Sequence, residues 1–192
     1  MRCTVIVALI AAVVLVAPAA AQDFSWYFND GPDASYLWTD TGIAPFWERM
    51  GPTEIAAGDV TCTYTDLPNP GEVSAYYACS YPEVADYSGC HFWCEIYLSN
   101  NWPGHANPVS ATLGVGTCGQ EGTFTAIATP VTVICDQQDA TLTCGIKFTF
   151  DFGNVPSCVL SNESLIVKLT YGGEAYDTHI FWDGECCPSA LH

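Results

Sequence analysis

The sequence is poor in basic side chains. Its 192 residues contain only four lysines and arginines against 21 aspartates and glutamates, which gives a formal net charge of −17 at pH 7. A strongly acidic protein repels phosphate backbones and anionic lipid head groups. The balance therefore disfavours nucleic acid and bare anionic membranes as partners, and cations are the partners that the charge attracts.

A long apolar segment is also lacking. The longest apolar run, residues 5–16, falls well short of the roughly 20 residues that a membrane-spanning helix needs. Arg2 precedes this run and the small residues 19–21 follow it, which is the layout of a secretory signal peptide. The sequence predicts a signal peptide over 1–21, a single domain over 22–192, a secreted or periplasmic location, and no membrane insertion.

Recognisable catalytic motifs are missing as well. The sequence contains no G-x-S-x-G, H-E-x-x-H or C-x-x-C pattern and no phosphate-binding glycine loop. The E-x-D-x-E strand pattern, which would present the two carboxylates of a sandwich glycosidase, is absent, and Glu95 in CEIYL stands alone. Carboxylates from different strands could still meet. We assign no catalytic residue from the sequence, and an enzyme is the less favoured class.

The four histidines are scattered along the chain. His179 follows Asp177 by two residues, so a strand would place both on one face as an acid–base or metal pair. A surface histidine beside a surface aspartate explains this spacing more simply. His91, in CHFWC, resembles a zinc spacing only if its flanking cysteines are reduced, which export argues against. Neither histidine is assigned a site.

Cysteine, by contrast, is abundant. The sequence has 11 cysteines, and removal of the signal peptide with Cys3 leaves an even set. In an oxidising compartment an even set indicates a disulfide framework. The predicted framework comprises Cys62, Cys79, Cys90, Cys94, Cys118, Cys135, Cys144, Cys158, Cys186 and Cys187.

Symmetry predicts two of the pairings. The segment from Cys62 to Cys79 is centred on the turn dipeptide Pro70-Gly71, and the segment from Cys135 to Cys144 is centred on residues 139–140. If each segment folds as a hairpin, its two cysteines lie opposite each other at a distance that a disulfide tolerates. We therefore predict the bonds Cys62–Cys79 and Cys135–Cys144.

The two closest pairs are poor candidates for bonding to each other. Cys90 and Cys94 on an extended strand lie about 13 Å apart. Adjacent residues such as Cys186 and Cys187 lie about 3.8 Å apart at Cα and point in opposite directions when extended. We expect this adjacent pair to tie the last strand to two different parts of the domain. Their available partners, in an order that the sequence leaves open, are Cys90, Cys94, Cys118 and Cys158.

The remaining pattern is that of an all-β protein. Short runs rich in Val, Ile, Thr, Tyr, Phe and Trp recur between Gly, Pro, Asn and Asp, with hardly any helical periodicity. Such spacing predicts an antiparallel β-sandwich of jelly-roll type, here stapled by disulfides. The one helical candidate, residues 43–50, contains Pro45 and is expected to form a loop or a single turn.

Alternation within two runs predicts which side chains face the core. In SLIVKLTY, the residues at 165, 167, 169 and 171 share one face, and those at 166, 168 and 170 share the other. In GIKFTF, Ile146, Phe148 and Phe150 lie opposite Lys147 and Thr149. Both runs should therefore line the core.

Tryptophan is frequent, with six residues, and several stand beside polar loop residues. Trp102 lies in SNNWPGH and Trp38 lies in LWTDTG. Exposed aromatic faces beside Asn or Asp stack on sugar rings and hydrogen-bond their hydroxyls. The predicted ligand-binding residues are Trp38, Trp47, Trp102, Asn100 and Asn101.

The many strands, the closing HIFWD and the aromatic-rich loops resemble the short exported jelly-roll proteins of bacteria and, more distantly, carbohydrate-binding modules. The resemblance implies a structural calcium ion near the paired terminal strands. The ligands it implies here are Asp23, Asp30, Asp177 and Asp183.

The predicted function follows from this combination. We expect an exported, non-catalytic β-sandwich that binds a surface ligand. The expected ligand is a glycan or another cell-surface component. The alternative is a structural or adhesive subunit of a cell envelope or extracellular matrix, for which disulfides supply durability. A secreted hydrolase comes third, and it would show a deep pocket with paired carboxylates.

Overall fold

The computed structural model describes residues 25–29, 46–51, 63–67, 76–100, 106–119, 122–136, 145–171, 178–182 and 189–192. The regular structure in these ranges consists of β-strands, and none of the ranges contains a helix. The predicted all-β class is confirmed. The predicted signal peptide lies outside the described residues, so the division into 1–21 and 22–192 remains a prediction.

Thirteen strands are described. In chain order they are β1 (Trp26–Asn29), β2 (Phe46–Gly51), β3 (Thr63–Leu67), β4 (Tyr76–Cys79), β5 (Glu83–Asp86), β6 (His91–Asn100), β7 (Asn107–Thr117), β8 (Thr123–Ala126), β9 (Val131–Cys135), β10 (Ile146–Asn154), β11 (Val159–Tyr171), β12 (Thr178–Trp182) and β13 (Ala190–Leu191).

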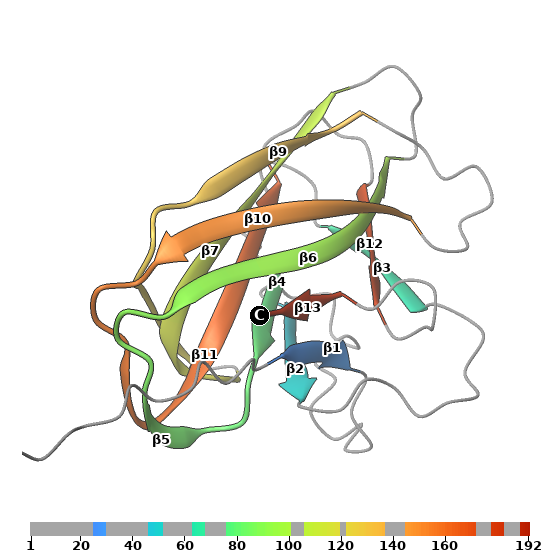
Figure 1. Ribbon diagram of the computed structural model, residues 1–192. Helices are drawn as coiled ribbons and strands as arrows, with labels where there is room; N and C mark the ends of the chain where they lie inside the picture. Colours follow the sequence, from blue (N-terminus) through green and yellow to red (C-terminus); the bar gives the residue numbers. More distant parts are fainter. Residues whose placement is uncertain are drawn as a thin grey trace, which may run out of the picture.

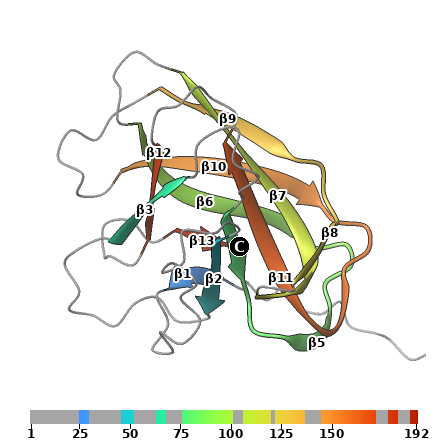
Figure 2. The ribbon, with the colours of Figure 1, turned by 180° about the vertical axis from the view of Figure 1, so that it is seen from behind.

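The strands form a sandwich-like arrangement of two layers (Figures 1 and 2). In one layer β6 pairs with β10, β12 and β13. In the other β11 pairs with β7, β4 and β5, and β7 pairs in addition with β8 and β9. The layers are joined through β1 and β2, because β1 pairs with β13 and with β2, and β2 pairs with β4. Among the described strands only the β2–β4 pair is parallel. The antiparallel sandwich is thus confirmed, whereas its jelly-roll type remains a prediction.

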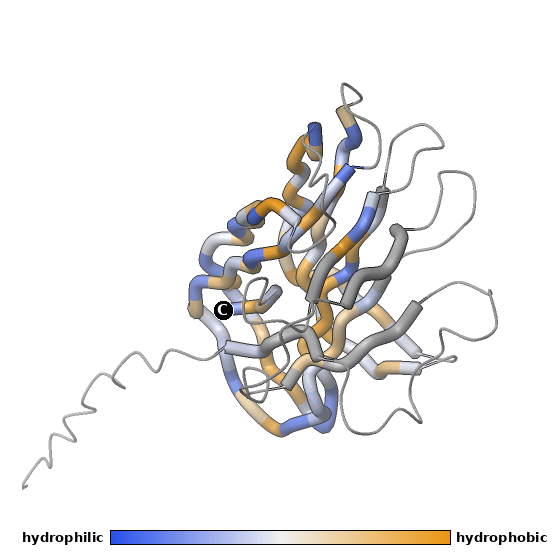
Figure 3. Tube along the Cα trace, turned by 90° about the vertical axis from the view of Figure 1, so that its right-hand side faces the viewer, coloured by the Kyte–Doolittle hydropathy of each residue, from blue (hydrophilic) through white to orange (hydrophobic). Residues whose placement is uncertain are grey.

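The core lies between the layers because the long strands alternate. Along β6 the side chains at even positions are buried, and apolar segments recur along the strands of both layers (Figure 3). The main cluster takes side chains from both layers; its members on the four long strands are Phe92, Cys94, Ile96, Leu98, Val109, Ala111, Leu113, Phe150, Leu160, Leu165, Val167 and Leu169.

The predicted alternation is confirmed on β10 and β11. Phe150 is fully buried, whereas Lys147 and Thr149 are exposed. On β11 Leu165, Val167 and Leu169 of the expected inward face are buried, but Ile166 on the opposite face is buried too. Its position is explained by a second, smaller cluster in which Ile166 packs with Cys79, Tyr77 and Phe124. The outer side of this layer is therefore partly covered.

The expectation of a loop or turn over residues 43–50 is wrong. Phe46–Gly51 forms β2, which pairs with β1 on one side and β4 on the other. Pro45 disfavours a helix but precedes the strand, so it removes no hydrogen bond from it.

The predicted bond Cys62–Cys79 is also wrong. Cys79, at the end of β4, is bonded to Cys118, which follows β7, with the two Cα atoms 6.4 Å apart. The hairpin on which the prediction rested does not form, because β3 pairs with β12 and β4 pairs with β2 and β11. Sequence symmetry about a turn identifies a disulfide only when the flanking strands pair with each other.

The observed bond fits an oxidising, non-cytoplasmic compartment. Cys90, Cys94 and Cys158 carry thiols in this structure. Cys135 lies at the buried end of β9. Its predicted partner Cys144 lies outside the described residues, as do Cys62, Cys186 and Cys187, so the rest of the framework remains a prediction.

Candidate functional site

One outward face of the sandwich carries polar and aromatic side chains in register. Because the even positions of β6 enter the core, His91, Trp93 and Glu95 point outward. Asp151 on β10 lies opposite Trp93 in the backbone register. His192, directly after β13, lies opposite Trp93 on the other side, since the two residues exchange backbone hydrogen bonds of 2.8 and 3.2 Å. We define the open face as Ser25, His91, Trp93, Glu95, Lys147, Asp151, Asn154 and His192.

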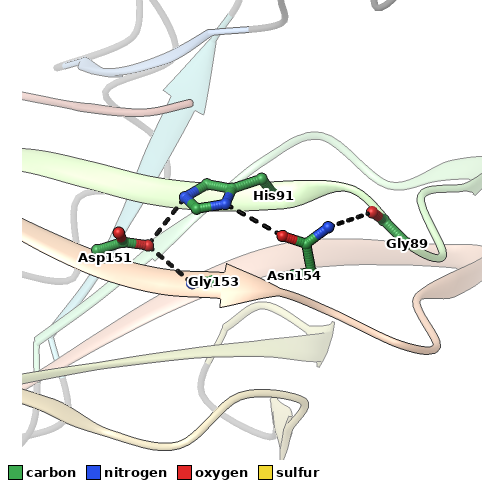
Figure 4. A network of polar contacts seen from close by, with 5 residues as sticks. All are labelled: Gly89, His91, Asp151, Gly153 and Asn154. Atoms are coloured by element: carbon green, nitrogen blue, oxygen red, sulfur yellow. Dashed lines mark hydrogen bonds and ion pairs between the residues drawn. The ribbon is translucent and has the colours of Figure 1, made fainter.

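At one end of the open face the His91 ring lies between two side chains of β10, Asp151 and Asn154 (Figure 4). Its Nε2 atom lies 2.9 Å from Asp151 Oδ1, and its Nδ1 atom lies 3.2 Å from Asn154 Oδ1. Asn154 in turn donates from Nδ2 to the Gly89 carbonyl at 3.1 Å. Both ring nitrogens of His91 face oxygen acceptors, which is an arrangement that a protonated imidazole satisfies. The ion pair is largely exposed, so its contribution to stability is about 0 to 1 kcal/mol.

A bulge in β10 places the Asp151 carboxylate beside the His91 ring. The register with β6 shifts between Asp151 and Gly153, and Gly153 has φ +71°, a conformation that glycine adopts without the strain of a Cβ atom. The Gly153 N–H donates to Asp151 Oδ1 at 2.8 Å, which fixes the carboxylate beside the ring. The bulge therefore positions an acid–imidazole pair on the surface.

The centre of the open face is a row of aromatic rings that ends at a serine. The Trp93 ring lies 5.7 Å from the His91 ring and is stacked on the His192 ring at 5.2 Å, with 19° between the planes of the latter pair. The Ser25 hydroxyl lies 2.8 Å from His192 Nδ1. Stacking on Trp93 thus orients the His192 imidazole toward Ser25.

The environment favours a neutral His192. Burial lowers the pKa of its half-buried ring below the ordinary value of 6.5; the Glu95 carboxylate acts in the opposite direction, and the Lys147 ammonium adds to the lowering. Lys147 Nζ donates to Glu95 Oε1 at 3.0 Å, and this hydrogen bond is the main cause that raises the pKa of Lys147. In the tautomer with the proton on Nε2, His192 Nδ1 accepts the Ser25 hydrogen bond.

A serine hydroxyl that donates to a neutral imidazole is the nucleophile–base half of a Ser–His arrangement. His192 can take the hydroxyl proton as Ser25 attacks, and the nearby Glu95 charge favours the imidazolium that results. The open face therefore presents a serine hydroxyl hydrogen-bonded to an imidazole, with the Trp93 ring stacked on that imidazole.

The ligand-binding residues predicted from the sequence are mostly outside the described part of the chain; those outside are Trp38, Trp102 and Asn101. Trp47 lies in β2, where the structure describes the backbone only. Asn100 is fully buried at the end of β6, and its Nδ2 donates to the Cys135 carbonyl at 3.2 Å. Of the five, only Asn100 has a described side chain, and it is buried away from the open face, so the ligand-binding set remains a prediction.

The calcium ligands implied by the resemblance lie outside the described residues as well: Asp23, Asp30, Asp177 and Asp183. The described ranges hold no group of three or more His, Cys, Asp or Glu side chains that could bind a metal. His179 is buried on β12, so it is not the surface histidine that the sequence favoured. The calcium site remains a prediction.

Sequence analysis missed Ser25, Trp93, Asp151 and His192 as members of one face. The spacing of His91 and Trp93 on a strand was the one local signal, since residues two apart share a face. Ser25 and His192 are 167 residues apart in the sequence and meet only because β1 pairs with β13. No local pattern identifies such a pair.

The described residues include no helix with the length and apolarity that a membrane crossing requires.

The fold defines an antiparallel β-sandwich. No protein-family model matches the sequence, and no curated protein matches it. Solved structures with a similar fold include an α-amino acid ester hydrolase, with a TM-score of 0.52, 9% identity, and coverage of 91% of this chain and 36% of that one. A CocE/NonD family hydrolase from Staphylococcus aureus is similar with a TM-score of 0.51, 10% identity, and coverage of 88% and 36%. At this identity the likeness concerns the fold, and the chain spans about a third of the length of either hydrolase.

These comparisons correct the predicted function. The expectation of a non-catalytic sandwich that binds a glycan is wrong, because the similar structures are hydrolases. The prediction failed because strand pattern and aromatic content describe a sandwich, and one sandwich fold serves unrelated functions.

Proposed function

We propose that the protein is an exported hydrolase that cleaves esters, with Ser25 as the nucleophile and His192 as its base. The observation that carries the proposal is the 2.8 Å contact between Ser25 Oγ and His192 Nδ1 on the open face. The likeness in fold to an α-amino acid ester hydrolase and to a CocE/NonD hydrolase supports the choice of class. Export is supported by the signal-like start of the sequence and by the Cys79–Cys118 bond.

The proposed reaction has two steps. Ser25 Oγ attacks the ester carbonyl carbon while His192 Nδ1 takes the hydroxyl proton; the C–O bond to the alcohol then breaks, and the alcohol leaves with that proton. A water molecule next attacks the acyl-serine, and His192 takes its proton and returns it to Ser25 as the acid is released. The Glu95 carboxylate stabilises the imidazolium in both steps. Trp93 provides an apolar surface beside the reacting groups.

The reaction is tested with p-nitrophenyl esters of amino acids and short acids. Ser25→Ala and His192→Gln should each lower kcat/KM by about 100-fold or more, because each removes half of the pair. Ser110→Ala is the matched control, since Ser110 bonds Thr132 at 2.7 Å on the other layer and should leave turnover unchanged. A wild-type protein without turnover above the buffer rate, or a Ser25→Ala variant with full turnover, contradicts the proposal.

A second candidate is a structural subunit that completes a larger hydrolase assembly. It is favoured by one observation, that the chain matches only 36% of the length of each similar hydrolase. Here the Ser25–His192 hydrogen bond only fastens β1 to the end of β13. Ser25→Ala would then lower the melting temperature slightly without changing the rate of ester hydrolysis. This result separates the second candidate from the first.

A further inference from the structure

Two thiols lie at one junction of the fold. Cys90 occupies the position just before β6, and Cys158 the position just before β11. Both side chains carry free thiols in the structure, and neither takes part in the Ser25–His192 pair.

Backbone hydrogen bonds bring the two cysteines to the same residue. The Tyr87 N–H donates to the Cys158 carbonyl at 2.8 Å, which extends the β5–β11 pairing of Asp86 with Val159 by one position. The Cys90 N–H donates to the Tyr87 carbonyl at 3.0 Å across a tight turn, in which Gly89 has φ +83°. Such a turn holds its first and last Cα atoms within about 7 Å of each other. Cys90 is therefore folded back toward the strand position opposite Cys158.

Further hydrogen bonds hold this junction from both sides. The Val155 N–H donates to the Cys90 carbonyl at 2.9 Å, and the Gly89 N–H donates to the Val155 carbonyl at 2.6 Å. The Cys158 N–H donates to the Ser88 hydroxyl oxygen at 3.0 Å. The backbone at both cysteines is thus fixed without a bond between the sulfur atoms.

The two thiols also influence each other electrostatically. Burial is the main cause that raises the pKa of Cys158 to about 11, and the charge of Cys90 is the next. The pKa of the Tyr87 hydroxyl is raised by burial first, then by Glu83, and also by both cysteines. This mutual influence agrees with the backbone hydrogen bonds that bring both cysteines to Tyr87.

We propose that Cys90 and Cys158 are a modification site at which the protein closes a second disulfide, tying the β5–β6 turn to the start of β11. The co-reactant is a small-molecule disulfide of the oxidising compartment. Cys90 is the attacking thiol because it is exposed, whereas Cys158 is only 2% exposed.

The exchange balances in two steps. The Cys90 thiolate attacks one sulfur of the external disulfide, so a mixed disulfide forms on Cys90 and one thiolate leaves. Cys158 then loses its proton to that thiolate or to water and attacks the Cys90 sulfur, which expels the second external thiolate. The two protein thiols lose two electrons and the external disulfide gains them. Closure also secures Gly89, whose carbonyl accepts from Asn154 beside His91.

The order of attack makes the test specific. The full chain is treated with glutathione disulfide, blocked with one alkylating reagent in acid denaturant, reduced, and labelled with a second reagent before peptide mapping. In the wild type both Cys90 and Cys158 should carry the second label and be joined in the unreduced digest. Cys158→Ala should stop at glutathione on Cys90, whereas Cys90→Ser should leave Cys158 unmodified, with at least a tenfold lower yield of mixed disulfide.

Cys94 is the matched control thiol. It is fully buried in the core, and burial raises the pKa of its thiol well above the ordinary 9.0, so it should keep the first label in every variant. Wild-type mapping needs no substitution, so the test stands even if a variant fails to fold. First label on Cys90 and Cys158 after the treatment, or a bond from either one to another cysteine, overturns the proposal.

Discussion

The Ser25 hydroxyl and the His192 ring owe their contact to the residues that surround them. Trp93 stacks on the His192 ring, and burial of that ring lowers its pKa, so the imidazole is neutral near pH 7 and can accept a proton. Glu95 and Lys147 act on the same ring with opposite effects. The readiness of His192 to act as a base is therefore set by three neighbouring side chains, Trp93, Glu95 and Lys147, and can be tested without measuring turnover.

The first prediction concerns the titration of His192. Its ring should titrate below pH 6.5, because burial disfavours the charged form. Glu95→Gln should lower the midpoint further, since it removes a stabilising negative charge and leaves the Lys147 charge unpaired. Ring-proton chemical shifts followed by NMR measure both midpoints. Glu163→Gln on β11 serves as the control, and a wild-type midpoint at or above 6.5 would contradict the description of this site.

Single residues on the open face were only partly predictable. His91 drew attention in the sequence because of its neighbours Cys90 and Cys94, although its partners prove to be Asp151 and Asn154 on β10. That pairing depends on the register between β6 and β10 and on a bulge, neither of which a local pattern reveals.

At the scale of elements, close approach of strands constrains particular residues. On β7 a Cβ atom at Gly114 would lie 2.6 Å from the Thr125 carbonyl oxygen and overlap the ring of Phe124. Phe124 is itself packed against the Tyr77 ring, with 5.8 Å between the ring centres. Neither the backbone of β8 nor this ring can move without loss of contacts.

Gly114→Ala should therefore destabilise the protein by about 1 to 3 kcal/mol, the usual cost of excess volume in a packed site. Urea unfolding followed by circular dichroism measures the change in free energy of unfolding. Thr125→Ala, on the exposed side of the neighbouring strand, should change it by no more than about 0.5 kcal/mol. Equal stability of Gly114→Ala and the wild type would show that β7 and β8 are not packed as described.

The elements differed in how far the sequence could predict them. Long strands such as β6, β10 and β11 carry enough alternating residues for their faces to be read directly. β5 and β13 went unpredicted because four and two residues are too few to show a period. β2 was not predicted, because Pro45 excludes a helix over this segment but does not disturb a strand that begins at Phe46.

At the scale of the molecule, Cys79–Cys118 ties the end of β4 to the residue after β7. The bond closes a loop of 39 residues, for which the loss of chain entropy in the unfolded state amounts to about 4 kcal/mol. Because β4 and β7 both pair with β11, the bond spans the layer that they share.

Cys79→Ala and Cys118→Ala should each lower the free energy of unfolding by about 2 to 5 kcal/mol. The double variant should lose little more than either single one, because all three lack the same bond. Denaturant unfolding of the three variants gives the comparison. Additive losses would mean that the two cysteines have separate partners, as the discarded Cys62–Cys79 hairpin requires.

The most direct test of the account is whether Ser25 is a nucleophile. A fluorophosphonate probe, which phosphonylates activated serine hydroxyls, should add one group per chain to the folded protein, and peptide mapping should place it on Ser25. The label should be lost in both Ser25→Ala and His192→Gln, since the second removes the base that accepts the hydroxyl proton. No label on the folded wild-type protein, or a label on any other residue, would contradict the assignment of Ser25 and His192 as a catalytic pair.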